Sequence, residues 1–185
     1  MENIDLKKAK AISKYLSYIL RHDPDDAGIT LDKNGWTNTN ILIQQLKLRF
    51  PEVDKTLLEY IVATNNKQRF IFNDDKSLIR ANQGHSIDVE LNLIEQEPPT
   101  VLFHGTTIDS VRSIMEEGLK KQSRHHVHLS ENVTTALQVG SRHGRVAILK
   151  IHSGKMYADG YTFYISANHV WLTDHVPPAY IEDEF

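Results

Sequence analysis

The chain of 185 residues contains no cysteine, which excludes disulfides and cysteine-bound metals. No apolar run approaches the roughly 20 residues that a membrane helix needs. The first five residues lack the basic and then apolar pattern of a secretory signal. Positive charge is not in surplus either: the net charge of -3 argues against a protein that coats nucleic acid non-specifically. We therefore expect a cytoplasmic protein. If it binds RNA, we expect it to do so through a few arginines that contact particular phosphates.

Histidine, by contrast, is abundant, with ten residues in the chain. His126 and His128 flank Val127, so on a strand they share one face. A zinc site is the alternative interpretation, but no carboxylate or cysteine completes a ligand set and no H-E-x-x-H pattern occurs. We expect no metal. The Arg, His, Gly and Thr residues nearby suit a phosphate-rich ligand better, because arginine binds phosphate oxygens in pairs.

The clearest boundary in the chain is the segment 95–100, where Pro98 and Pro99 follow charged residues. It predicts a first lobe over 1–97 and a second over 98–185. Each lobe is small for independent stability, so we expect the two to pack together with the active site between them.

The first lobe is predicted to consist of helices followed by a two-stranded wing, the pattern of a winged helix. Apolar residues from Ile12 to Leu20 recur at helical spacing, and Pro24 forces this helix to end. The elements expected next are a strand within 29–36 that meets a turn at Asn34-Gly35, helices near 40–50 and 54–64, and a hairpin of 69–72 and 77–80.

The second lobe is predicted to be an α+β unit built on a split sheet. A short strand at 101–103 runs into His104, and an amphipathic helix follows, capped by Gly118. The helix is expected to turn Ile108, Val111, Ile114 and Met115 inward. Further expected elements are strands at 127–129, 146–151, 163–165 and 170–172, and a helix at 132–140.

Several polar clusters are candidates for chemistry. Arg21-His22 ends the first helix, where cations also stabilise the negative end of the helix dipole, which is the simpler interpretation. Lys67–Phe70 leads into an expected strand, and on its own this segment is typical of a solvent-exposed sheet edge. Arg80–Ser86 places Arg80, Gln83 and His85 around a glycine, where a polar turn is the alternative. The second lobe contributes three more clusters, at 104–106, 124–130 and 142–144.

Five of these strings occur in the order found in the tRNA 2'-phosphotransferase family, which the chain resembles from about residue 10 to 175. They are Lys14–His22, Lys67–Phe70, Ile79–Ser86, Phe103–Thr106 and Arg124–Ser130. The resemblance implies an N-terminal winged-helix lobe that binds RNA and a C-terminal ADP-ribosyltransferase-like lobe that binds NAD.

The activity that the resemblance implies removes an internal 2'-phosphate from RNA and consumes NAD. The RNA phosphate displaces nicotinamide to form an ADP-ribosylated 2'-phospho-RNA. The ribose 2''-hydroxyl then attacks phosphorus, giving 2'-OH RNA and ADP-ribose 1'',2''-cyclic phosphate. No membrane or protein partner is implied.

The family's catalytic Arg-His-Arg-Arg set falls on Arg21, His22, Arg69 and Arg124, with Arg142 as the competing fourth position. Three arginines can neutralise and orient a dianionic phosphate, and His22 can bind it or manage a proton.

The NAD-binding positions implied by the resemblance are His104, Gly105, Thr106, His128 and Ser130, joined by Arg142. Gly105 is expected to let the dinucleotide approach closely. The residues expected to contact RNA are Arg80, Gln83 and His85.

Two alternatives remain open at this point. One is an ADP-ribosyltransferase acting on terminal phosphates of nucleic acid, and the other is a non-catalytic module that binds RNA or nucleotide. The strand at 145–149 offers no glutamate of the kind that many ADP-ribosyltransferases use to activate an acceptor. Its absence suits a phosphate nucleophile and argues against ordinary protein ADP-ribosylation.

Overall fold

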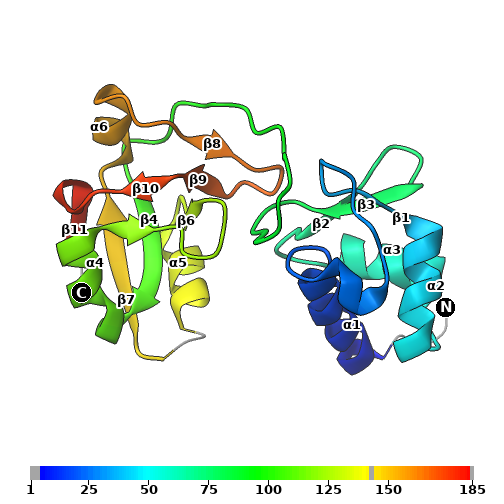
Figure 1. Ribbon diagram of the computed structural model, residues 1–185. Coiled ribbons are helices and arrows are strands. Elements are labelled where there is room, and N and C mark those ends of the chain that lie inside the picture. Colours follow the sequence, from blue (N-terminus) through cyan, green and yellow to red (C-terminus); the bar gives the residue numbers. More distant parts are fainter. Residues whose placement is uncertain (1–4, 142–143, 184–185) are drawn as a thin grey trace. The chain divides into compact units, whose positions relative to one another are not determined.

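The computed structural model describes residues 5–141 and 144–183, and the chain forms two compact units, Met1–Asn92 and Leu93–Phe185 (Figure 1). Both combine helices with small antiparallel sheets, so the α+β class is confirmed. In the described part of the chain, no helix is both long and apolar enough to cross a membrane.

The division between the units falls after Asn92, five residues before the boundary after residue 97 that the sequence predicted. Residues 93–100 are bound to the second unit by hydrogen bonds. The main chain of Gln96 donates to the carbonyl of Phe163 at 2.9 Å, and the Ser153 hydroxyl donates to the carbonyl of Pro99 at 2.6 Å. This segment therefore belongs to the second unit rather than to a free linker.

The described part of the first unit contains three α-helices and a three-stranded sheet of order β1-β3-β2. Asp5, Asn38 and Asp54 cap its three α-helices by accepting main-chain hydrogen bonds. The elements are α1 (Leu6–Ile19), η1 (Pro24–Ala27), β1 (Thr37–Asn38), α2 (Thr39–Arg49), α3 (Lys55–Ala63), β2 (Phe70–Phe72) and β3 (Leu78–Ala81).

The predicted helices and hairpin of the first unit are confirmed, but the strand expected within 29–36 is wrong. No residue of that range lies in a strand; β1 begins at Thr37, after a turn in which Gly35 has a φ of 80°. Residues 29–32 lack a strand partner because β1 itself occupies the edge of β3, with Thr37 opposite Ile79. Ile29 is instead buried in the core, and its N–H donates to the carbonyl of Pro24 at 3.1 Å.

The second unit is built on two three-stranded sheets, of order β11-β7-β4 and β6-β9-β8, and a small pair, β10-β5. The elements are β4 (Leu102–Thr107), α4 (Ile108–Glu117), β5 (Leu119–Lys120), β6 (Val127–Leu129), α5 (Val133–Gly140), β7 (Val146–Ile151), α6 (Ser153–Ala158), β8 (Tyr164–Ile165), β9 (Trp171–Thr173), β10 (His175–Val176), η2 (Pro178–Tyr180) and β11 (Ile181–Asp183).

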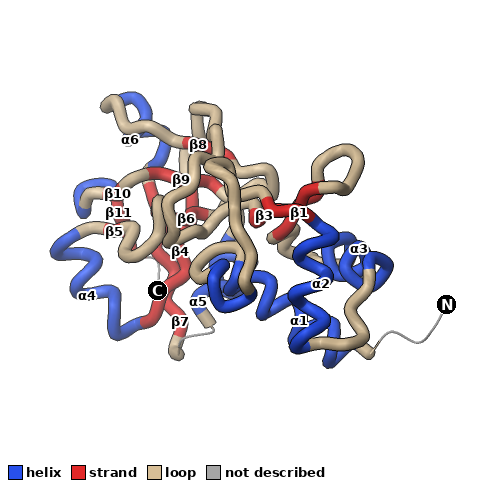
Figure 2. The backbone as a smooth tube through the Cα atoms, turned by 45° about the vertical axis from the view of Figure 1, so that its right-hand side comes forward, coloured by secondary structure: helices blue, strands red, loops and turns tan. Residues whose placement is uncertain are grey.

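The two larger sheets of this unit are joined where Phe103 and Ser130 exchange main-chain hydrogen bonds of 2.8 Å. Helices α4 and α5 lie on either side of the β11-β7-β4 sheet (Figures 1 and 2). Strand β4 is longer than predicted because His104 to Thr107 continue to pair with β7.

Helix α4 is confirmed, with Gly118 as its cap at a φ of 82°, but the prediction of its inward face is partly wrong. Val111 and Ile114 pack against the core, whereas Ile108 is 44% exposed and Met115 37% exposed. The helix contacts a small sheet along a narrow stripe, so only residues three apart on that stripe are covered.

Helix α5 packs directly on the main chain of β4 because both surfaces lack side chains at the point of contact. A Cβ atom on Gly105 would lie 1.8 Å from the carbonyl oxygen of Ala136, and one on Gly140 would lie 3.0 Å from the carbonyl carbon of Gly105. Gly105 therefore has a packing role against α5, and the close approach of a dinucleotide expected at Gly105 stays a prediction.

Gly105→Ala should lower the free energy of unfolding of the second unit by about 1–3 kcal/mol, because α5 must move to admit the methyl group. Gly160→Ala is the control, since no atom lies within 4 Å of its added Cβ and only its positive φ is strained. Urea denaturation followed by the fluorescence of Trp171, in a Trp36→Phe background, measures both. Equal losses in the two variants would contradict the packing argument.

Candidate functional site

The first group of site residues follows directly after helix α1. The N–H groups of Arg21, His22 and Asp23 all donate to the carbonyl of Tyr18, at 3.3, 2.9 and 3.3 Å. This tight turn, completed before Pro24, places the side chains of Arg21 and His22 beside one another at the helix end.

Ser86 holds both residues of this turn from 64 positions away in the sequence. Its N–H donates to the carbonyl of Arg21 at 2.9 Å, and its hydroxyl lies 2.9 Å from Nδ1 of His22. A serine hydroxyl can donate to a neutral imidazole or accept from a protonated one. It can therefore orient the His22 ring in both protonation states. The sequence placed Ser86 in a polar cluster but gave it no role.

Arg69 is positioned by Asn65, which the sequence analysis missed. The Asn65 side-chain oxygen accepts from Nη1 of Arg69 and from the N–H groups of Lys67 and Arg69, each at 3.3 Å. Its amide donates in turn to the Ser13 hydroxyl at 3.2 Å, which ties the turn to α1. An asparagine just after a helix, two residues before a lysine, is typical of such a turn and was the available signal.

The Arg80–Ser86 segment is anchored within the first unit. The guanidinium of Arg80 lies 4.6 Å from the ring centre of Trp36 and donates to the carbonyl of Asn34 at 3.3 Å. His85 is 1% exposed and packs near Gly35, while Gln83 is half-buried. Arg80 and His85 thus fix the segment that carries Ser86, and the RNA contact expected for Arg80, Gln83 and His85 stays a prediction.

The second group of site residues lines a cavity of about 550 Å³ within the second unit. Of the predicted residues, His104, Thr106, Arg124 and His128 line it. Among the described residues, Gly105 and Ser130 are not part of the lining, since Gly105 faces α5 and Ser130 pairs with β4 through its main chain. Lining residues that the sequence analysis missed are Ser110, Ser113, Glu117, Lys120 and Lys121.

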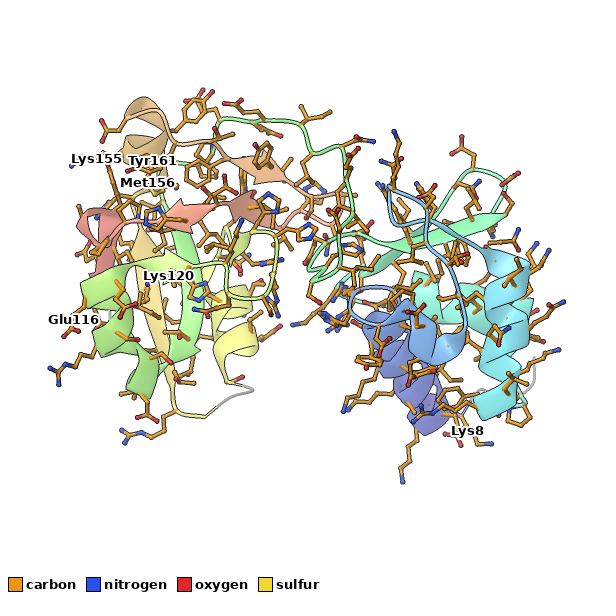
Figure 3. All side chains as sticks on the ribbon, in the orientation of Figure 1. Lys8, Glu116, Lys120, Lys155, Met156 and Tyr161 are labelled. Carbon is orange, nitrogen blue, oxygen red and sulfur yellow. The ribbon has the colours of Figure 1, made fainter. Side chains whose placement is uncertain are left out.

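The cavity carries a surplus of positive charge in a chain whose net charge is -3. Lys120, Lys121 and Arg124 line it together with a single carboxylate, Glu117. Glu117 forms an ion pair with Lys120 at 2.6 Å (Lys120 is labelled in Figure 3). Lys121 and Arg124 remain as the cationic side chains that favour an anionic ligand.

His104 presents a hydrogen-bond acceptor to this cavity. Its Nδ1 lies 3.0 Å from the carbonyl oxygen of His128, so Nδ1 carries the proton and donates. Burial lowers the pKa of His104, the His128 carbonyl opposes that shift, and the charge of Arg124 adds to it. The ring is therefore neutral near pH 7, with Nε2 as an acceptor.

Two further predictions concern Arg142 and metals. Arg142, the competing fourth catalytic position and a predicted NAD contact, lies outside the described residues. Over the ranges that the structure describes, no group of three or more His, Asp or Glu side chains is arranged to hold a metal ion.

The cationic side chains and histidines that line this cavity, like those of the Arg21–His22 turn, are of the kind that favours phosphate-bearing ligands. The model of the RNA 2'-phosphotransferase, Tpt1 / KptA family matches residues 7–175, and the chain belongs to this family. The resemblance seen in the sequence is thereby confirmed.

Similar proteins carry the corresponding name. A probable RNA 2'-phosphotransferase of Flavobacterium johnsoniae is 55% identical, over 94% of this chain and 96% of its own. Those of Fusobacterium nucleatum and Acaryochloris marina are 49% and 47% identical, over 92% and 94% of this chain and 96% of their own.

Ser86→Ala should change the tautomer ratio of the His22 ring by up to about tenfold, because one hydrogen bond contributes about 0.5–1.5 kcal/mol. Nitrogen and carbon NMR shifts of the ring measure the ratio. Ser86→Thr keeps the hydroxyl and should restore it. An unchanged ratio in the alanine variant would show that Ser86 does not favour one tautomer of the ring.

The free energy of unfolding should fall as the pH decreases through about 6.5, the ordinary histidine pKa. Because the pKa of His104 is lowered in the folded chain, the unfolded chain binds the proton at a higher pH than the folded chain does. The free energy of unfolding stops falling once the pH lies below the lowered pKa. His104→Asn keeps a donor for the His128 carbonyl but does not titrate. Denaturation at about pH 7.5 and 5.5 should show a smaller drop in this variant, although His126, whose pKa burial also lowers, still contributes. Equal drops would refute the assignment.

Proposed function

We propose that this protein is an NAD-dependent RNA 2'-phosphotransferase that moves an internal RNA 2'-phosphate to ADP-ribose. The observation that carries the proposal is the family match over residues 7–175, which covers most of both units. The relatives named above are each called a probable RNA 2'-phosphotransferase. The cationic cavity of the second unit supports binding of an anionic dinucleotide.

The two units have separate roles in this proposal. The first is a winged-helix lobe for RNA, an assignment supported by helices α2 and α3 followed by the β2–β3 hairpin. The second is an ADP-ribosyltransferase-like lobe for NAD, an assignment supported by its two sheets joined at Phe103 and Ser130.

In the first step, an oxygen of the RNA 2'-phosphate attacks C1'' of the nicotinamide ribose, and the bond to nicotinamide breaks. Arg21, Arg69 and Arg124 neutralise and aim the phosphate dianion. Asn65 orients Arg69 for this role through its 3.3 Å hydrogen bond to Nη1. The phosphate is already anionic, which fits a β7 strand that carries no glutamate.

In the second step, the ribose 2''-hydroxyl attacks phosphorus, and the bond between phosphorus and the RNA 2'-oxygen breaks. The hydroxyl loses a proton and the RNA oxygen gains one. His22 serves the phosphate as a hydrogen-bonding and proton-handling group, and Ser86 holds its ring.

The NAD lobe holds its ligand through the cavity residues. Nε2 of His104 accepts a hydrogen bond from a ribose hydroxyl, and Thr106 and His128 contact the same ribose. Lys121 and Arg124 face the phosphates of the ligand. Ser130 and Gly105 shape the strand from outside the lining, and Arg142 adds a further phosphate contact. Arg80 and Gln83 flank the RNA from the first unit.

The decisive test uses RNA with one radiolabelled internal 2'-phosphate, with and without NAD. The label should appear in ADP-ribose 1'',2''-cyclic phosphate, and only when NAD is present. A stable ADP-ribose adduct on the RNA would indicate a transferase of another kind, and no reaction would indicate a binding module.

In the same assay, Arg69→Ala should lower kcat/KM by about 10²–10³-fold, the loss typical of one charge-stabilising donor. Binding of NAD should change little. Lys76→Ala is the matched control, because Lys76 is an exposed cation of the same hairpin that pairs with Glu59. Wild-type turnover in Arg69→Ala would remove Arg69 from the mechanism.

A further inference from the structure

Helix α1 carries four lysines and no acidic residue, in a chain with an overall acidic balance. Lys7, Lys10 and Lys14 are spaced three and four residues apart, so they lie on one side of the helix. Continuing the same spacing leads to Ser17 and then to Arg21. We call Lys7, Lys10 and Lys14 the lysine stripe; it runs along α1 toward the Arg21–His22 turn.

The lysine stripe is exposed, and the described part of the chain does not neutralise its charges. Among the described residues, no carboxylate lies within 4.0 Å of the ammonium group of Lys7, Lys10 or Lys14. Lys8, labelled in Figure 3, lies off the stripe and pairs with Glu52 at 3.6 Å. The ion pair on this helix is thus made by the lysine that does not belong to the stripe.

The positive charges of the lysine stripe destabilise helix α1. Like charges three and four residues apart repel each other by about 0.2–0.5 kcal/mol per pair. Lys7 also sits in the first turn, where the helix dipole disfavours a cation. The electrostatics of the helix therefore does not favour these lysines, whereas an external anion would be stabilised by them.

The opposite face of α1 limits what that anion can be. Ala9, Ile12, Leu16 and Ile19 are buried in the core of the first unit. The helix cannot insert an apolar face into a lipid surface, so a membrane anchor is disfavoured. A polyanion that lies along the outside of the helix fits the observations.

We propose that the lysine stripe is a track for the RNA backbone on one side of the 2'-phosphate. At 1.5 Å per residue, Lys7 and Lys14 lie about 10 Å apart along the axis, the length of about three stacked nucleotides. Arg21 follows in the turn just beyond the end of α1. The stripe thus forms a path for about three nucleotides that leads toward the phosphate site. This inference rests on the proposed function, because it takes Arg21 as the phosphate-binding end of the path.

The test compares a triple variant, Lys7→Gln with Lys10→Gln and Lys14→Gln, with a matched control. The control carries Lys33→Gln, Lys47→Gln and Lys55→Gln, three exposed lysines elsewhere in the same unit, and so has the same net charge. Glutamine keeps the helix propensity of lysine. The ligands are RNAs of three and about twelve nucleotides, each bearing one 2'-phosphate.

The stripe variant should bind the longer RNA more weakly. The slope of log Kd against log salt should fall by about 2, because each RNA phosphate that a lysine neutralises adds about 0.7 to the slope. Its KM for that RNA should rise, while kcat and the kinetics of the trinucleotide stay as in the wild type. The melting temperature at low salt should not fall. The control should keep the wild-type slope.

An equal decrease of slope in both triple variants would assign the effect to net charge and overturn the proposal. So would equal damage to the trinucleotide reaction, which would place the defect in the phosphate site. Retained RNA binding together with abolished binding to phosphatidylserine vesicles would reassign the stripe to a lipid surface. If no variant turns over the RNA, the proposed function fails, but the salt slope still decides whether the stripe binds RNA.

Discussion

The contact of α5 with the main chain of β4 determines how the second unit is built. With no Cβ on Gly105, the carbonyl of Ala136 approaches the strand directly, and Gly140 completes the contact from the helix side. Side chains alternate along a strand, so the residues on either side of Gly105 point away from α5. Those residues are His104 and Thr106, which line the cavity. Close packing on one face of β4 therefore leaves its other face free to bind a ligand.

In the first unit, neutral oxygen atoms orient the side chains of Arg69 and His22. Asn65 holds Arg69 and Ser86 holds His22, in each case through a side-chain oxygen that carries no net charge. A carboxylate in the place of Asn65 would orient the guanidinium and also neutralise it. A neutral partner fixes the direction of the side chain without itself neutralising its charge, and fixed, charged groups are what electrostatic preorganisation requires.

Local signals in the sequence predicted the elements whose cause is local. Helix α1 ends before Pro24, the hairpin turns at residues 73–76, and β7 follows its apolar run. Elements whose cause is a distant partner were missed: β5 and β10 have two residues each and exist because they pair with one another. The strand expected near Ile29 failed for the same reason, since β1 had taken the partner edge of β3. In the site, motifs identified Arg21, His22 and Arg69. Asn65 shows only the general pattern of a turn, which does not point to Arg69, and the cavity serines have no distinctive local pattern.

The hydrogen bond between Ser86 and His22 also affects how much the site must move during a proton transfer. A hydroxyl group reverses from donor to acceptor by turning about a single bond, a motion of picoseconds to nanoseconds in side chains. The imidazole can therefore gain or lose a proton while the main chain, fixed by the Ser86 N–H to the Arg21 carbonyl, stays in place. On the Ser86 side of the ring, a change in the protonation of His22 therefore requires only the turning of one hydroxyl group.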